Sequence, residues 1–257
     1  MRKLSAIARP LAGVRDAALS VLYPTECRVC GRHIESWRDG VACAQCWENA
    51  ASNWQQQKLC AKCGAPLPPL APHLQVVERE CGSCCDFAFS TARACGVYDG
   101  ALLESVLWLK AHPQIPLRLR QLICAAFVAQ PVLHQSESII PVPLHPTRLA
   151  ERSFNQAELI ADVLARQTGL RVDTASLLRV KATERHRAGM DARERAKSLR
   201  RAFRVHAPRL IAKRVVLLVD DVMTTGTTTH EIAQTLLEGG AKAVNVLTVA
   251  RAASVFT

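Results

Sequence analysis

The chain of 257 residues has no run of 18 or more apolar residues, so it offers no candidate transmembrane helix. Arg9, Arg15 and Asp16 interrupt the apolar runs near the start, and no small-residue cleavage site follows, which does not fit a secretory signal. We therefore expect a cytoplasmic protein without a membrane span. Disorder of the whole chain is also excluded, because a hydrophobic content of 49% can supply a real core.

Acidic residues are few relative to basic ones, since 22 Asp and Glu accompany 33 Lys and Arg and give a formal net charge of +11. Most of the excess lies after residue 99. The stretch from Arg179 to Arg214 alone holds 13 basic and three acidic residues. This concentration predicts an anionic partner, either nucleic acid through Arg179 to Arg214 or a polyphosphate substrate. A solvated basic face is the simpler alternative.

Cysteine is abundant, and eight of the eleven cysteines form four C-x-x-C pairs. A gap of two residues lets both thiolates of a pair reach one ion, and two pairs complete a tetrahedral shell of four thiolates. A reducing compartment disfavours disulfides, the main alternative. The four pairs therefore predict two Zn2+ ions with a structural role, because closed shells leave no open coordination position for a substrate.

The grouping of the pairs is partly readable from glycine. Gly31 and Gly64 directly follow the first and third pairs, at a position where a knuckle often needs positive φ. Each of these pairs then opens one ribbon, and an interleaved grouping remains the alternative. We expect one shell of Cys27, Cys30, Cys43 and Cys46 and a second of Cys60, Cys63, Cys81 and Cys84. The three remaining cysteines, Cys85, Cys95 and Cys124, are expected to be small buried apolar residues.

The C-terminal part predicts a βαβ unit. Val215 to Val219 is too apolar to have one face in water, which indicates a central strand of a parallel sheet. A helical pattern follows and stops at Gly239 and Gly240, and Ala243 to Val249 supplies a second strand. Ligand sites in such units lie at the carboxyl ends of the strands.

Polar residues stand at that end of the first strand. Asp220 and Asp221 are well placed for sugar hydroxyls or a hydrated Mg2+. The loop of Thr224, Thr225, Gly226, Thr227 and Thr228 then meets the helix N-terminus, whose free amides favour an anion. No lysine follows the glycine as it does in a Walker A loop, so a single phosphate on a sugar fits better than a triphosphate.

Val215 to Thr228 resembles the phosphoribosyl pyrophosphate signature of type I phosphoribosyltransferases. The resemblance implies that Asp220 and Asp221 hold the ribose hydroxyls and that Thr224 to Thr228 hold the 5-phosphate. Purine-salvage members typically place an aspartate where this chain has Thr224, so purine salvage is disfavoured, and the threonine resembles the orotate-type pattern.

A second string, P-V-P-L-H-P-T-R-L-A-E-R-S-F-N-Q-A-E-L-I from Pro141 to Ile160, resembles the ComF family. The resemblance extends over nearly the whole chain, including the double zinc ribbon and the segment Leu107 to Lys110. It implies that Pro143 and Leu144 occupy the pyrophosphate-loop position and that Arg179 to Arg201 fall near a mobile loop. His186 and Ser198 depart from the family pattern, which weakens residue assignments in that loop. Ser153 and Gln156 fit a capping box for the helix that ends this string.

Together these patterns predict an α/β protein: an N-terminal helix and double zinc ribbon over 1–90, then a parallel-sheet, type I phosphoribosyltransferase-like domain over 91–257. The first functional hypothesis is Mg2+-dependent phosphoribosyl transfer from phosphoribosyl pyrophosphate, linked to DNA uptake or use of exogenous DNA. Asp220 and Asp221 would position the ribose, with Lys110 and loop residues such as Lys181, Arg185 or Arg187 stabilising pyrophosphate. The alternatives are a non-catalytic, zinc-dependent adaptor that binds nucleic acid or a helicase-like partner, and a structural domain with a vestigial pocket.

Overall fold

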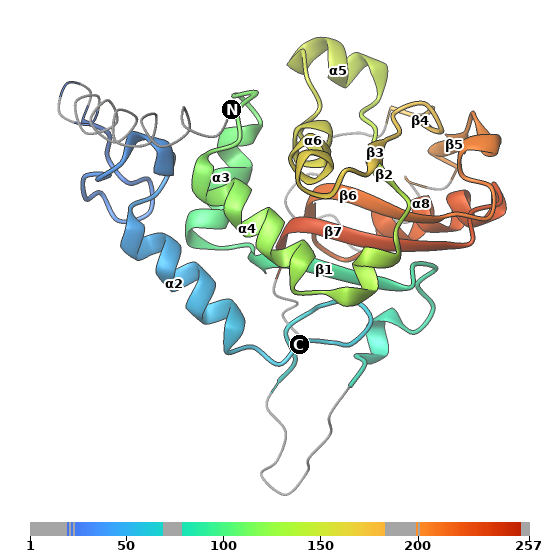
Figure 1. Ribbon diagram of the computed structural model, residues 1–257, viewed down its shortest axis with the longest axis horizontal. Helices are drawn as coiled ribbons and strands as arrows, with labels where there is room; N and C mark the ends of the chain where they lie inside the picture. Colours follow the sequence, from blue (N-terminus) through green and yellow to red (C-terminus); the bar gives the residue numbers. More distant parts are fainter. Residues whose placement is uncertain are drawn as a thin grey trace, which may run out of the picture.

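The computed structural model describes residues 20, 22, 24–68, 79–182, 199 and 201–252. Its centre is a five-stranded sheet in which every pair of neighbouring strands is parallel (Figure 1). The strands lie in the order β1 (Thr91–Val97), β7 (Ala243–Arg251), β6 (Val215–Met223), β2 (Ser138–Pro141) and β3 (Arg171–Val172). A separate antiparallel pair consists of β4 (Leu177–Arg179) and β5 (Phe203–Val205). The expected parallel α/β architecture is confirmed, and the predicted central strand is in the middle of the sheet.

Helices cover both faces of the sheet (Figure 1). One face is packed by α3 (Gly100–Leu109), α4 (Leu117–Val128) and α6 (Gln156–Thr168), and the other by α8 (Thr227–Glu238). Side chains of β6 alternate between the two cores, because successive residues of a strand point to opposite faces. Leu217 and Val219 join the first core, while Val216 and Leu218 join the second. Both faces of the sheet are therefore shielded from water at β6, which explains the continuous apolar run from Val215 to Val219.

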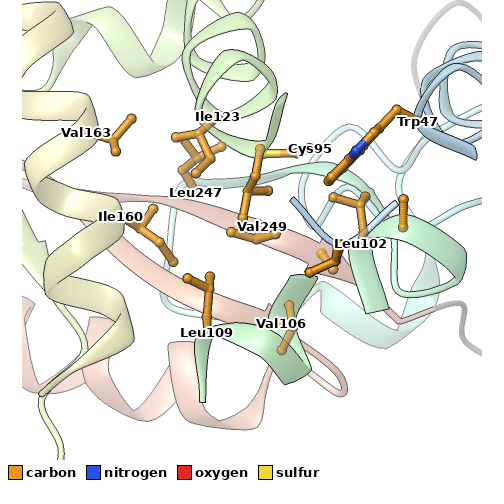
Figure 2. Packing of buried hydrophobic residues seen from close by; sticks show 14 of the residues in the cluster. Trp47, Cys95, Leu102, Val106, Leu109, Ile123, Ile160, Val163, Leu247 and Val249 are labelled. Atoms are coloured by element: carbon orange, nitrogen blue, oxygen red, sulfur yellow. The ribbon is translucent and has the colours of Figure 1, made fainter. Parts of the chain in front are cut away.

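The cysteine-rich segment is divided between the two cores. Figure 1 shows α2 (Ala44–Gln55) running from the first ribbon to the second. Cysteines of the first ribbon belong to the core of α3, α4 and α6, into which Trp47 of α2 also packs, near Leu102 (Figure 2). Cysteines of the second ribbon belong to the core of α8. The double ribbon thus packs against both faces of the sheet at its β1 edge.

Short helices complete the described fold. They are η1 (Trp37–Asp39), η2 (Gly82–Cys84), η3 (Pro131–Gln135), η4 (Pro208–Leu210) and α5 (Pro146–Arg152). None of the described helices is long and apolar enough to cross a membrane. The N-terminal helix expected before the ribbons and the loop candidates Arg185 and Arg187 lie outside the described residues. The domain boundary at residue 90 stays a prediction.

Two local expectations were wrong. The side chain that caps α6 belongs to Asn155, whose Oδ1 accepts from the amide of Ala157, whereas Ser153 ends α5 with φ of 66°. The spacing of a capping box can be met by chance when a neighbouring residue is an equally good cap. Cys85 is exposed, and its Sγ lies 3.2 Å from the carbonyl oxygen of Gly82. Cys95, by contrast, is buried as expected, and burial raises the pKa of its thiol to about 12.

Candidate functional site

Two half-buried aspartates stand near the carboxyl end of β6. The amide of Asp221 donates to Oδ1 of Asp220 at 2.8 Å, and the amide of Val222 donates to Oδ1 of Asp221 at 2.7 Å. The backbone therefore fixes both carboxylates where the central strand meets solvent. This is the position at which open α/β sheets bind ligands.

The surroundings of Asp220 and Asp221 disfavour ionisation of their carboxyl groups. Burial raises the pKa of Asp220 well above its ordinary value, the charge of Asp221 raises it further, and Arg179 opposes both. Burial also raises the pKa of Asp221, whereas Lys110 and Arg152 lower it. A bound cation would favour the charged forms, and clustered carboxylate oxygens are the donors that Mg2+ prefers. The residues present therefore fit a hydrated Mg2+ ion.

The threonine loop leads from β6 into α8. Gly226 has φ of 85°, and α8 begins at Thr227 without a side-chain cap. The hydroxyls of Thr225 and Thr227 lie 2.9 Å apart. The buried guanidinium of Arg251 fixes the start of the loop by donating to the carbonyl oxygens of Met223, at 3.1 Å, and Thr224. A helix N-terminus without an N-cap side chain, next to the paired hydroxyls of Thr225 and Thr227, is suited to an anion such as phosphate.

A hollow of about 290 Å3 joins these groups to Lys110. Its lining consists of Tyr98, Lys110, Leu199, Asp221, Val222, Thr224, Thr225, Thr227 and Thr228. The structure thus brings together the loop threonines, one of the predicted aspartates and the predicted lysine, although Lys110 is about 110 residues away along the chain. Gly226 is buried and outside this lining.

A second cavity of about 420 Å3 adjoins the first, because Asp221 and Thr228 line both. It contains Asp220 and the turn after β2, where Val142 and Leu144 form part of the wall and Pro143 does not. The rest of the wall includes three arginines, Arg148 and Arg152 of α5 and Arg179 of β4, together with Glu151 of α5. The two cavities together form one site with carboxylates at its centre, threonines on one side and arginines on the other.

The turn that carries Lys110 is held by the first ribbon. The ring of Trp108 stacks on His112 with centroids 3.5 Å apart, and the guanidinium of Arg28 lies 4.8 Å from the Trp108 centroid. His112 also donates its amide to the carbonyl oxygen of Trp108 at 3.0 Å. Arg28 lies between Cys27 and Cys30, so the first zinc knuckle contacts the helix that presents Lys110.

The second ribbon contacts the threonine loop. An added Cβ at Gly226 would lie 2.7 Å from the Phe87 ring, so that ring occupies the space beside the loop. The amide of Ala88 donates to Nδ1 of His230 on α8 at 3.0 Å, and the rings of Phe87 and His230 lie 5.6 Å apart. The first ribbon therefore contacts the segment that carries Lys110, and the second ribbon contacts the threonine loop. Both segments line the smaller hollow.

The eight paired cysteines form two clusters, each with all four Sγ atoms within 4.8 Å of one another. The clusters are the sequential sets, Cys27, Cys30, Cys43 and Cys46, and Cys60, Cys63, Cys81 and Cys84. Opposed sulfurs lie 3.8 Å apart in the first, between Cys27 and Cys46, and 3.5 Å apart in the second, between Cys60 and Cys84. Four thiolates about 2.3 Å from a tetrahedral zinc lie about 3.8 Å apart, so both clusters fit structural zinc.

The knuckle backbones also suit thiolates. Burial opposes ionisation of Cys27, but backbone amides, including those of Cys43 and Cys30, lower the pKa of this thiol to about 6. Amides of Cys63 and Cys81 act in the same way on Cys60, whose pKa falls to about 7. Gly31 and Gly64 have φ of 75° and 64°, as the knuckle geometry predicts.

The basic stretch from Arg179 to Arg214 is not one patch within the described residues. Arg179 and Lys181 lie on the side of the site, whereas Lys213 and Arg214 immediately precede β6, at the amino end of the parallel sheet. Lys242 is next to them, because its amide donates to the carbonyl oxygen of Arg214 at 2.8 Å. Sequence proximity alone could not show this division.

Several site residues have no individual sequence signal. Tyr98, Phe87 and Arg251 reach the site only because β7 lies beside β6 and β1 lies beside β7 in the sheet. Gln156 lies in the string that resembles ComF, but the sequence predicted only a helix-capping role for it. The structure places Gln156 in the wall of the larger cavity.

Known proteins match both halves of the chain. The double zinc ribbon domain matches residues 18–85, and the phosphoribosyl transferase domain matches residues 150–254. DNA utilization protein YhgH of Salmonella typhimurium is 32% identical over 235 residues, which is 89% of this chain and 97% of that protein. Competence protein F of Haemophilus influenzae is 32% identical over 201 residues, covering 75% of this chain and 84% of that protein. Glutamine phosphoribosylpyrophosphate amidotransferase from B. subtilis is 20% identical over 56% of this chain and 30% of its own, with a TM-score of 0.38.

Proposed function

This chain belongs to the ComF family, and on that premise we propose that it binds phosphoribosyl pyrophosphate, or a related sugar phosphate, with Mg2+ and acts in the use of exogenous DNA. The relatives named for DNA utilization and competence support the biological role. The phosphoribosyl transferase domain supports the ligand class. Transfer of the phosphoribosyl group to an acceptor is the reaction for which such a site is suited.

One observation carries the proposal: the paired aspartates and the threonine loop face a common site at the carboxyl end of the central strand. The loop amides and hydroxyls suit the 5-phosphate, and the adjacent carboxylates suit the ribose hydroxyls. Mg2+ would supply charge neutralisation for the diphosphate. Lys110 lines the same hollow, and its exposed side chain adds a positive charge there.

The arrangement also suits the transfer step. As the bond between the sugar C1 and the diphosphate oxygen breaks, positive charge develops on the sugar ring and negative charge on the leaving group. Half-buried carboxylates beside the ribose stabilise the first charge, and arginines in the adjoining cavity stabilise the second. Preorganised charges of this kind act more strongly in a partly dry site than in water.

Isothermal titration calorimetry of phosphoribosyl pyrophosphate, pyrophosphate and ribose 5-phosphate, each with Mg2+, tests the proposal. Wild-type protein should bind the sugar diphosphate, and the double variant Asp220→Asn/Asp221→Asn should lose about a hundredfold or more in affinity. Gln167→Leu, on the exposed last turn of α6, is the control and should bind as wild type does. Equal affinity of the wild type and the double variant would rule out this site.

A second candidate function is direct contact with nucleic acid, as expected for an adaptor that works with a helicase-like partner. The observation that favours it is a group of exposed basic residues at the amino end of the sheet, opposite the aspartates: Arg171, Arg209, Lys213, Arg214 and Lys242. Fluorescence anisotropy with single-stranded DNA should show affinity falling steeply with salt, and Lys213→Gln/Lys242→Gln should flatten that dependence. Affinity that does not change with salt would count against phosphate contact.

A further inference from the structure

Arg251, the last residue of β7, has a buried guanidinium group. The residue is 4% exposed, and its Nη1 donates to three backbone oxygens, those of Met223, Thr224 and Ala252. Its Nε has no hydrogen-bond partner among the described residues, and no carboxylate in that part of the chain forms an ion pair with it. A buried cation without a counter-ion is unfavourable in a fold. Proteins keep such residues chiefly at functional sites.

Arg251 lies where three strands end together. In the register of the sheet it is opposite Val97 of β1 and Met223 of β6. Its carbonyl oxygen accepts from the amide of Tyr98 at 2.8 Å, and the amide of Ala252 donates to the carbonyl oxygen of Met223 at 3.0 Å. The backbone of Arg251 therefore holds Tyr98, and its side chain holds the start of the threonine loop. Both of these segments line the smaller hollow.

The side chain of Arg251 also sets the direction of two amides in the loop. No peptide bond among the described residues is cis, and in a trans peptide the carbonyl oxygen and the next N–H point in opposite directions. The carbonyl oxygens of Met223 and Thr224 accept from the guanidinium, so the N–H groups of Thr224 and Thr225 point away from it. Neither N–H has an acceptor within the described ranges, and both residues line the hollow. The two donors are therefore available to an anion there.

The charge of Arg251 favours the same ligand. The guanidinium contacts the carbonyl oxygen of Thr224, so the cation lies directly behind the loop. Attraction between a cation and an anion is stronger across a buried peptide than across water. The charge of Lys110, by contrast, is exposed and screened by solvent. A phosphate on the hollow side of the loop would offset the buried charge of Arg251.

We propose that Arg251 is a positioning residue for the 5-phosphate of the sugar: it orients the amides of Thr224 and Thr225 and supplies a buried positive charge behind them. The inference rests on the proposed function, because it needs a phosphate at the threonine loop. Arg251 acts through the loop and does not touch the phosphate. A lysine at this position would keep the charge but lose the planar group that meets the carbonyl oxygens.

Calorimetry with ribose 5-phosphate on the full-length, zinc-loaded protein tests the assignment. The variants are Arg251→Met, which removes the charge, and Arg251→Lys, which keeps it. The matched control is Asn245→Ala, because Asn245 lies at the amino end of the same strand, is 2% exposed, and donates to the carbonyl oxygen of Val132 at 3.2 Å and to Oγ of Ser136 at 3.3 Å. Zinc content and thermal melts establish whether each variant is folded.

Arg251→Met should weaken ribose 5-phosphate by about tenfold or more, because the charge is lost and both peptides are released. Arg251→Lys should recover part of that loss. Asn245→Ala should melt below the wild type but bind as the wild type does. In 15N-threonine NMR spectra at saturating ligand, the amide of Thr225 should shift downfield in the wild type and less so in Arg251→Met.

Wild-type affinity and an unchanged Thr225 shift in both Arg251 variants would exclude the positioning role alone. Equal losses of affinity in Arg251→Met and Asn245→Ala would assign Arg251 to the fold. If Arg251→Met does not fold, Arg251→Lys decides, since wild-type affinity of that variant would exclude orientation by the guanidinium. Failure of the proposed function has a different signature, because ribose 5-phosphate would then not bind the wild type, which overturns both proposals together.

Discussion

At the scale of single residues, the site contains groups that lower the stability of the fold when no ligand is bound. Asp220 and Asp221 are adjacent, half-buried and held by backbone amides, and burial raises the pKa of each. Gln156 buries an amide donor without a partner among the described residues. Residues that lower the stability of the fold are retained where they bind a ligand, which is typical of binding sites.

Asp220→Asn should therefore raise stability while it removes binding. The raised pKa means that the folded state resists ionisation of Asp220. Well below pH 3.8, where the unfolded carboxyl also holds its proton, wild type and variant should be equally stable. As pH rises through the raised pKa, the wild type loses stability that the variant keeps, because the Asn amide has no charge but can still accept from the Asp221 amide.

Thermal melts from pH 4 to 8 in the absence of Mg2+ would check this expectation. Saturating Mg2+ and phosphoribosyl pyrophosphate should reverse the order, since only the wild type is stabilised by binding. A variant that melts below the wild type at pH 7.5 without ligand would show that the Asp220 charge stabilises the fold.

At the scale of elements, the threonine loop depends on a segment from the other end of the chain. Phe87 follows the second zinc shell by three residues, and its ring occupies the space beside Gly226. The hydrogen bond from Ala88 to His230 joins the same segment to the first turn of α8. The second ribbon is thus a support for the helix N-terminus that the proposed phosphate would approach.

Phe87→Ala should weaken ribose 5-phosphate binding several-fold and lower the free energy of unfolding by about 1 to 2 kcal/mol, because a half-buried ring is lost beside the loop. Phe87→Leu, which keeps most of the apolar volume, should restore most of the affinity. Calorimetry and thermal melts measure both effects. Unchanged affinity of Phe87→Ala would show that the loop holds its shape without the ribbon.

At the scale of the whole molecule, the two four-cysteine clusters belong to the cores on opposite faces of one sheet. The first ribbon packs with α3 and α4 and reaches Lys110 through Arg28 and Trp108, and the second packs with α8. α2 spans the distance between them along the edge strand (Figure 1). The ribbons are therefore part of the core, and loss of a metal ion should weaken ligand binding at the sugar-phosphate site.

Native mass spectrometry should find two zinc ions per chain. Cys60→Ser should leave one and Cys85→Ser should leave two, because only Cys60 belongs to a cluster. Cys60→Ser should also weaken ribose 5-phosphate binding, since the second shell supports Phe87, and it should lower the melting temperature by more than Cys85→Ser does. Retention of two zinc ions in Cys60→Ser would contradict the assigned shell.

The sequence by itself determined what depends on local spacing and on composition. Continuous apolar runs require strands buried on both faces, C-x-x-C pairs followed by glycine require knuckles, and two aspartates before a threonine loop require a strand end that opens into a helix. These inferences name residues within a few positions of one another, and the structure agrees with them.

The tertiary structure alone decided which distant segments meet. Strand order placed β7 beside β6 and β1 beside β7, and so brought Arg251 and Tyr98 to the site, and packing of the ribbons placed Phe87 against Gly226. The same topology divided the basic stretch between two ends of the sheet. Such contacts arise from long-range burial and sheet pairing, which leave no periodic signal in the chain. The residues that support this site from other segments are therefore the ones that sequence spacing could not identify.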